Sequence, residues 1–265
     1  EKTPGAIQVL NYKGKELWSK SGSMGPKIAH WGDLDGDGTD EMVVATEAFG
    51  GVQAFSSDGD SLWKHRSMGP MWGIAVIPAY GDRKGLVIAP ASGSMLRAYN
   101  HDGKKGDPYS PSGLYFSCVT AAQLDDKGLV QVLAVGSSFT PDRELMVAFD
   151  LAENKAWSVT ANPNLDITRD QKFCCGDADG DGIKDWVFPD SNNDLIFVSH
   201  DGTKLGTLKG GGYLDRFEVI PRPGESSLLI TLTTNSLTAM ALESAPATTP
   251  ESPDPGSVQL EAAPT

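Results

Sequence analysis

The stretch GDLDGDGTDEMVVAT, Gly32 to Thr46, returns later in the chain as GDADGDGIKDWVFPD, Gly176 to Asp190. Each copy is an acidic loop with regularly spaced glycines, followed by a strand-sized apolar run. Asp and Gly are also frequent in ordinary solvated turns, which is the simplest alternative. The two copies match at six positions and precede equivalent runs, so the recurrence indicates a loop with a defined role.

The spacing of the acids in these loops predicts metal binding. Carboxylates fall at positions 1, 3, 5 and 9 of each loop, and the glycine at position 6 allows a reversal that turns the carbonyl of position 7 inward. Hard oxygen ligands in this number suit Ca²⁺, which accepts roughly 6 to 8 of them with variable geometry. We therefore predict two calcium sites, one formed by Asp33, Asp35, Asp37, Thr39 and Glu41 and one by Asp177, Asp179, Asp181, Ile183 and Asp185.

The same opening residues begin an EF-hand loop, and that alternative fails. An EF-hand requires a glutamate at position 12 and a helix on each side. Position 12 is Val44 in the first loop and Phe188 in the second, and the flanking runs are strand-like.

A strand, turn and strand segment recurs along the chain. Its copies begin at residues 6, 51, 95, 145 and 195, with a weaker copy at 236. Equivalent positions 9, 54, 98, 148, 197 and 239 are 45, 44, 50, 49 and 42 residues apart. Alternating apolar and polar residues on both sides of a glycine turn are typical of β-hairpins.

Between these hairpins lies a second pair of apolar runs, so each period holds about four short strands. Four antiparallel strands per 40 to 50 residues is the blade of a β-propeller. The inner pairs fall at roughly 28–46, 71–92, 116–138, 170–191 and 213–235. The sequence thus predicts an all-β fold, a small β-propeller of five four-stranded blades, with the ring closed by the N-terminal hairpin, 6–20. Six blades is the alternative, because 236–242 also has the pattern of a strand.

The composition changes at Glu243. Residues 1–242 form the predicted propeller, whereas 243–265 are rich in proline, acidic, and without aromatic or basic residues. Such a segment buries too little apolar surface to fold alone, so we expect an extended tail or linker.

Charge and hydropathy limit the partners. With 22 basic and 35 acidic residues the net charge is −13, which repels phosphate and argues against nucleic acid. No apolar run approaches the roughly 20 residues of a transmembrane helix. The chain opens at Glu1 without methionine, which we interpret as a removed signal peptide, and we expect a secreted, periplasmic or cell-surface protein.

The two loops with their following strands resemble the FG-GAP or VCBS type of propeller repeat found in integrin-like propellers. The hairpins ending in Leu17-Trp18 and Leu62-Trp63 are also similar to those of quinoprotein-like propellers. The resemblance implies a structural Ca²⁺ linking the first two strands of a blade. The turns AYGDRKG, QLDDKG and IPRPGESS of the other blades lack the ligands, so calcium is expected in two blades only.

The three cysteines, Cys118, Cys174 and Cys175, have no metal-binding spacing. One disulfide from Cys118 to either neighbour is one interpretation, and three buried free thiols is the other. The choice stays open at this point.

Residues suited to catalysis are scarce. His101 and His200 occupy equivalent turns, so the repeat explains them, and His30 and His65 have no partner visible in the sequence. Trp18, Trp63 and Trp157 stand at equivalent hairpin ends, where we expect them to pack between blades. We therefore predict a binding or assembly module that is not an enzyme and contacts a protein partner or a larger complex. The alternatives are a carbohydrate-binding propeller and a propeller enzyme, either a polysaccharide lyase or a quinone-dependent dehydrogenase.

Overall fold

The computed structural model describes residues 6–21, 25–46, 50–66, 73–90, 95–109, 114–139, 142–150, 156–160, 173–190, 192, 194–209, 216–222, 225–233 and 235–242. The predicted tail, 243–265, lies outside these residues. Among the described residues, no helix has the length and hydropathy needed to cross a membrane.

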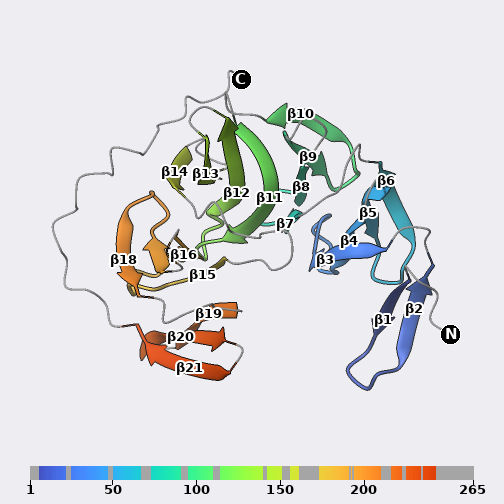
Figure 1. The fold of residues 1–265 in the computed structure, drawn as a ribbon. Helices are drawn as coiled ribbons and strands as arrows, with labels where there is room; N and C mark the ends of the chain where they lie inside the picture. Colours follow the sequence, from blue (N-terminus) through green and yellow to red (C-terminus); the bar gives the residue numbers. More distant parts are fainter. Residues whose placement is uncertain are drawn as a thin grey trace. The chain divides into compact units, whose positions relative to one another are not determined.

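The described part of the chain is built from β-strands joined by turns (Figure 1). The strands are β1 (Ile7–Leu10), β2 (Glu16–Lys20), β3 (Pro26–Gly32), β4 (Glu41–Thr46), β5 (Gly51–Phe55), β6 (Ser61–His65), β7 (Ala75–Ile77), β8 (Leu86–Pro90), β9 (Leu96–Asn100), β10 (Lys105–Tyr109), β11 (Leu114–Gln123), β12 (Val130–Phe139), β13 (Asp142–Asp150), β14 (Ala156–Thr160), β15 (Cys174–Gly176), β16 (Asp185–Pro189), β17 (Leu195–Val198), β18 (Lys204–Leu208), β19 (Arg216–Arg222), β20 (Glu225–Thr233) and β21 (Ser236–Ala241).

The strands form antiparallel sheets in chain order. We call β3–β6 sheet I, β7–β10 sheet II, β11–β14 sheet III, β15–β18 sheet IV and β19–β21 sheet V. Sheets I to IV have four strands each, sheet V has three, and β1–β2 pair as a separate hairpin. The predicted four-strand period is therefore confirmed in sheets I to IV.

Sheet V differs from the prediction in its third strand. The segment that made six blades an alternative is β21, and it pairs with β20 from Leu228↔Ala241 to Thr233↔Ser236. The two strands of the N-terminal hairpin pair with each other, through Ile7↔Lys20 to Leu10↔Glu16. Closure of a five-bladed ring by this hairpin stays a prediction.

The chain divides into two compact units, Glu1–Ala121 and Ala122–Thr265. In the first unit, β4 is buried on both faces. Met42 and Val44 pack with Phe55 against Ile7, Val9 and Trp18 of the hairpin. Val43 and Ala45 face the core shared with sheet II. The N-terminal hairpin covers one face of β4 and sheet II covers the other. The strand sequence EMVVAT is therefore apolar at consecutive positions and does not alternate between apolar and polar residues.

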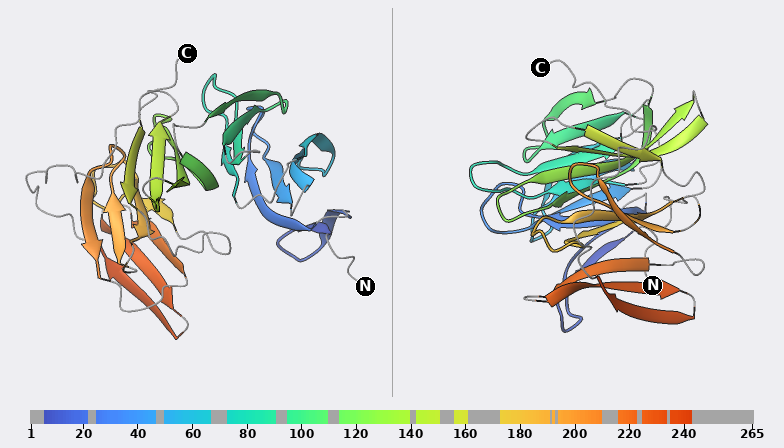
Figure 2. Two further views of the ribbon diagram at one scale, coloured as in Figure 1. Left: turned by 45° about the horizontal axis from the view of Figure 1, so that its top comes forward. Right: turned by 90° about the vertical axis from the view of Figure 1, so that its left-hand side faces the viewer.

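The second unit repeats this arrangement. Strand β16 is buried along its whole length. Val187, Leu195 and Phe197 of sheet IV pack against Val219 and Leu229 of sheet V. Figure 2 shows the strands of these sheets from two further sides.

Tryptophans join neighbouring sheets, as the sequence predicted. The indole N–H of Trp18 donates to the carbonyl of Ser57 at 2.8 Å. Trp63 bonds the carbonyl of His101 in the same way at 2.9 Å, and Trp157 bonds that of His200 at 2.9 Å. Each accepting carbonyl lies in the turn of the next outer hairpin, which also explains His101 and His200 as turn residues.

Candidate metal centres

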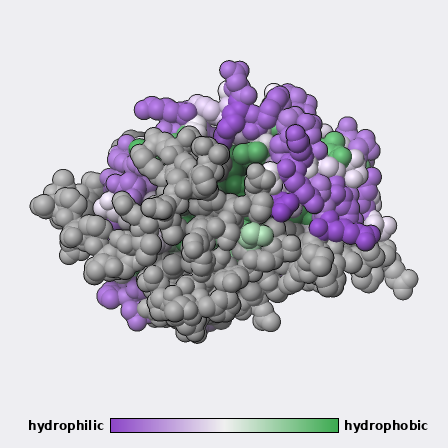
Figure 3. All heavy atoms as spheres, turned by 90° about the horizontal axis from the view of Figure 1, so that it is seen from above, coloured by the Kyte–Doolittle hydropathy of each residue, from purple (hydrophilic) through white to green (hydrophobic). Residues whose placement is uncertain are grey.

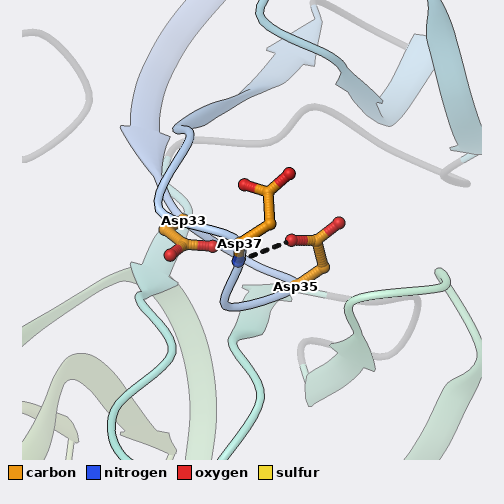
Figure 4. Close-up of side chains that lie close together, drawn as sticks. All are labelled: Asp33, Asp35 and Asp37. Atoms are coloured by element: carbon orange, nitrogen blue, oxygen red, sulfur yellow. Dashed lines mark hydrogen bonds between the residues drawn. The ribbon is translucent and has the colours of Figure 1, made fainter.

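The first acidic loop connects β3 to β4 and is shaped by its own carboxylates. Asp33 accepts backbone N–H bonds from Gly36 at 2.6 Å and Gly38 at 2.9 Å. Asp35 accepts from Asp37 at 3.0 Å, as Figure 4 shows, and Asp37 accepts from Thr39 at 2.7 Å. Gly36 and Gly38 have φ of +77° and +87°, a conformation that glycine adopts without strain. The glycine spacing is therefore a backbone requirement of this loop.

The second loop, between β15 and β16, repeats these bonds one for one. Asp177 accepts from Gly180 at 2.7 Å and Gly182 at 3.2 Å. Asp179 accepts from the backbone of Asp181 at 3.1 Å, and Asp181 accepts from Ile183 at 2.7 Å. Two segments far apart in the sequence thus fold into the same local structure.

The ninth residue of each loop carries a buried carboxylate. Glu41 is 6% exposed and accepts from Leu34 N–H at 2.8 Å. Asp185 is 1% exposed and accepts from Ala178 N–H at 2.8 Å. Glu41 is the first residue of β4 and Asp185 is the first residue of β16, and each side chain bonds the second residue of its own loop.

Burial makes a negative charge costly at these two positions. Burial raises the pKa of Glu41, and the neighbouring loop aspartates raise it further, against the lowering effect of the Leu34 bond. Burial raises the pKa of Asp185 to about 7, with the same opposition from Ala178 N–H and the same repulsion from the loop acids. A cation at the centre of each loop would offset this repulsion.

Two groups of acids lie close enough to share an ion. The ligand atoms of Asp33, Asp35 and Asp37 lie within 4.8 Å of one another, as do those of Asp177, Asp179 and Asp185. Each group could hold a metal ion, and its oxygen ligands suit Ca²⁺. Glu41 and Asp181 stand outside these triads. The N–H groups of Thr39 and Ile183 bond the fifth loop residue, and a ligand role for their carbonyls stays a prediction.

Both loops are tied to neighbouring sheets, a feature that the sequence analysis missed. In the first unit, Asp33 and Leu34 carbonyls accept from Ala79 and Gly85 N–H at 2.7 Å each. The ammonium of Lys84 donates to the carbonyl of Asp35. In the second unit, Lys184 N–H donates to Leu124 carbonyl at 2.8 Å.

The Lys184 ammonium also reaches the carbonyl of Gln123, at 3.0 Å. Lysines 84 and 184 occupy the corresponding place in their sheets, one or two residues before β8 and β16. A lysine shortly before the second strand of a sheet is the sequence signal that could have identified them.

The loop QLDDKG, between β11 and β12, has no comparable acid group among the described side chains. Asp125 accepts from Lys127 at 3.0 Å and Leu129 at 2.7 Å, which closes an ordinary turn.

Among the described side chains, no cysteine belongs to a group that could hold a metal ion. Cys174 and Cys175 carry free thiols, so the structure forms no disulfide at this pair. Adjacent residues on β15 point to opposite faces of the sheet, and Cys174 packs against the core shared by sheets IV and V. The side chain of Cys118, the partner considered in the sequence analysis, lies outside the described side chains.

Histidines do not form a catalytic group in the described residues. His65 stacks on Tyr99 with ring centroids 4.9 Å apart and contacts the carbonyl of Gly103 at 2.6 Å. His30 lies on β3, and burial lowers its pKa. These contacts account for His65, whereas the buried Nε2 of His30 has no hydrogen-bond partner among the described residues.

The comparison with protein families identifies a propeller. Residues 3–105 match the family model of the lambda-carrageenase beta-propeller domain. This match covers the hairpin, sheet I and strands β7 to β9 of sheet II. A search of curated proteins gives no match.

Solved propeller structures resemble the chain. BBS1N, solved in complex with ARL6DN, has a TM-score of 0.54 and 8% identity over 86% of this chain and 67% of its own. The Dos1 propeller has a TM-score of 0.53 and 9% identity over 89% and 62%. The Vibrio cholerae biofilm matrix protein Bap1 has a TM-score of 0.51 and 15% identity over 82% and 38%. At these identities the likeness shows the fold alone, and the fold is a β-propeller.

Proposed function

We propose that this chain is a five-bladed, calcium-stabilised β-propeller of the FG-GAP type that acts as a binding or assembly module without catalysis. The observation that carries the proposal is the position of the acidic loops. Each loop gathers several carboxylates and is hydrogen-bonded to a neighbouring sheet through Leu34 or Lys184. An ion bound there would fix the shape of a loop that is hydrogen-bonded to the neighbouring blade.

The residues that would hold calcium are the loop aspartates together with the buried Glu41 and Asp185. The ion would supply positive charge and fix the loop shape. No step of chemistry is assigned to it. Extracellular calcium is millimolar, which saturates even weak sites of this kind, so we place the protein outside the cytoplasm.

The proposed ring closure is supported by the last sheet. Ile220 and Leu232 are 38% and 40% exposed and stand next to the buried Val219 and Thr231. Leu237 is 71% exposed on β21, a strand without a buried residue. Strands with apolar side chains on both faces are typical of sheets covered on both sides. Another part of the ring would cover this face.

The hydrophilic surface supports a role in protein binding. On the face drawn in Figure 3 the described side chains are mostly hydrophilic, with small hydrophobic areas between them. A rigid propeller would present such polar loops to a protein partner, and its acidic charge would favour a basic one.

Carbohydrate binding is the second candidate, because residues 3–105 match a carrageenase propeller. Trp31 and Tyr80 are 44% and 40% exposed and could stack on sugar rings. The net charge of −13 opposes a sulfated polysaccharide, so a protein partner comes first. Retardation in a neutral galactan gel, lost in Trp31→Ala, would favour the second candidate.

The experiment that tests the calcium proposal combines a metal count with thermal unfolding. We expect about two Ca²⁺ per chain and a melting temperature about 10 °C lower in chelator, since an ion at 100 times its Kd contributes about 2.7 kcal/mol. Asp37→Asn and Asp181→Asn should each remove one ion while keeping an oxygen for the turn bond. Asp125→Asn is the matched control and should remove none. No bound calcium, together with unchanged melting, would refute the proposal.

A further inference from the structure

A lysine of the turn between β7 and β8 lies against the first acidic loop, which belongs to sheet I. The Lys84 ammonium donates a hydrogen bond to the backbone carbonyl of Asp35, the third residue of that loop. A Cβ placed on Gly36 would lie 3.5 Å from the Lys84 Nζ atom. Gly36 stands between Asp35 and Asp37, two of the three acids whose ligand atoms gather in this loop. The ammonium therefore lies at the backbone of the loop, beside its acid group.

Backbone hydrogen bonds between sheets I and II hold Lys84 at this place. Gly85, the residue that follows it, donates its N–H to the carbonyl of Leu34 in the same loop, at 2.7 Å. Ala79, on the other side of the turn, donates to the carbonyl of Asp33 at 2.7 Å. All of these residues belong to the first compact unit, Glu1–Ala121, so the contact is internal to that unit.

The second acidic loop has the opposite arrangement. Its lysine, Lys184, belongs to the loop itself, and the ammonium reaches the carbonyl of Gln123 at the end of β11, at 3.0 Å. The first loop thus receives a positive charge from the neighbouring sheet, whereas the lysine of the second loop places its charge on the backbone of sheet III.

A positive charge beside the acid group of the first loop has two effects on an ion bound there. It repels a divalent cation, since charges a few ångströms apart interact measurably even through water. It also stabilises the empty loop, because it offsets part of the repulsion among the clustered carboxylates. Both effects favour the empty loop, and a group that favours the empty state lowers the affinity for the ion by linkage.

The hydrogen bond of Lys84 would act in the opposite direction if the loop depended on it for the shape that binds the ion. The loop has its own means of keeping that shape, because Asp33 accepts backbone N–H bonds from Gly36 and Gly38. The second loop forms the same two bonds, from Gly180 and Gly182, and receives no lysine of this kind among the described residues. The charge of Lys84 therefore outweighs its hydrogen bond in setting the affinity.

We propose that Lys84 is a tuning residue that lowers the calcium affinity of the first acidic loop, so that the joint between sheets I and II responds to changes in calcium concentration. The inference rests on the proposed calcium sites and names a residue that regulates one of them. Lys84 supplies charge from one sheet to the loop of the next, and calcium binds that loop against this charge.

The test is a calcium titration of the full chain, followed by amide NMR. The amides of Gly36 and Gly38 report the first loop, and those of Gly180 and Gly182 report the second. Lys84→Met removes the charge and keeps an unbranched side chain. We expect the calcium concentration at half-maximal shift to fall about fivefold at the first pair of glycines, because a repelling charge is removed. It should stay unchanged at the second pair.

Two further variants separate charge from shape. Lys84→Arg keeps the charge and a donor, so its calcium midpoint should match that of the unmodified chain. Arg83→Met removes one charge from the same turn, where Arg83 bonds the carbonyl of Pro78 at 3.4 Å and not the loop, and should have a smaller effect. The difference caused by Lys84→Met should also shrink in about 0.5 M salt, because salt screens exposed charges.

Urea unfolding gives a readout that does not depend on the NMR titration. If Lys84 favours the empty loop, Lys84→Met should destabilise the chelated chain more than the calcium-saturated chain. A purely structural hydrogen bond would give the same loss in both conditions.

An unchanged or higher calcium midpoint at Gly36 and Gly38 in Lys84→Met would overturn the tuning role, as would an equal effect of Lys84→Arg. In both results the second pair of glycines still shifts with calcium, so the proposed calcium sites stand. Calcium-dependent shifts at none of the four glycines would reject the calcium sites and this inference with them.

Discussion

The backbone N–H of Gly85 donates a 2.7 Å hydrogen bond to the carbonyl of Leu34, inside the first acidic loop. In the second unit Lys184 N–H makes the equivalent bond to Leu124 at 2.8 Å, and there the acidic loop is the donor. Both acidic loops therefore lie at joints between sheets, where a change of loop shape is transmitted to the neighbouring sheet.

Chelation should loosen these joints before the sheets unfold. We expect faster amide hydrogen exchange at Gly85 and Lys184 in chelator, because each bond depends on the shape of an acidic loop. The amide of Leu129, bonded to Asp125 in a turn without an acid triad, is the internal control and should be unchanged. Uniform acceleration at all three amides would contradict a local effect.

The glycines that precede the loops should be intolerant of any side chain. A Cβ on Gly32 would lie 2.8 Å from Val76, and one on Gly176 would lie 2.5 Å from Val219. We expect Gly32→Ala and Gly176→Ala each to lower the free energy of unfolding by about 1–3 kcal/mol. Gly206→Ala, with nothing within 4 Å, is the control and should change it little. If urea unfolding gave the same loss for Gly206→Ala as for Gly32→Ala and Gly176→Ala, the close contacts with Val76 and Val219 would be contradicted.

The indole N–H bonds between sheets should contribute measurably to stability. Trp63→Phe keeps an aromatic ring over Gly103 and removes the bond to the His101 carbonyl. We expect a loss of about 1 kcal/mol in urea unfolding. Leu62→Ala, on the neighbouring half-exposed residue, should cost less than this. A larger effect of Leu62→Ala would show that buried apolar area contributes more than the indole hydrogen bond to the free energy of unfolding.

A buried hydrogen bond in the second unit allows the contribution of an indole N–H to be tested with single and double variants. Trp186, 1% exposed, donates its indole N–H to the side-chain oxygen of Gln131 at 3.0 Å. Gln131→Met should cost about 1–3 kcal/mol, since the buried N–H loses its acceptor. The double variant with Trp186→Phe should cost less than the sum of the single variants, and strict additivity would exclude coupling.

The thiol of Cys174 should be unreactive in the folded chain. Burial raises its pKa to about 12, against a smaller lowering by a backbone bond with Val219. At pH 8 the thiol lies far below this pKa and carries almost no thiolate, so alkylation by iodoacetamide should be slow until urea unfolds the chain. Rapid labelling of Cys174 in the folded chain, read by mass spectrometry, would contradict this.

The local pattern of the sequence determined much of this structure. Alternating strands, glycine turns and the recurring acidic loop are decided by neighbours along the chain, so the four-strand period and the loop aspartates could be predicted. The packing role of Trp18, Trp63 and Trp157 followed from their equivalent positions in the repeat.

Only the tertiary structure decided what the loops and turns contact. Lys84 and Lys184 reach backbone carbonyls of a neighbouring sheet, Glu41 and Asp185 become buried, and β21 joins sheet V as a third strand. These contacts join residues from different sheets or depend on burial by a neighbouring sheet, and residue spacing along the chain carries no direct signal of either.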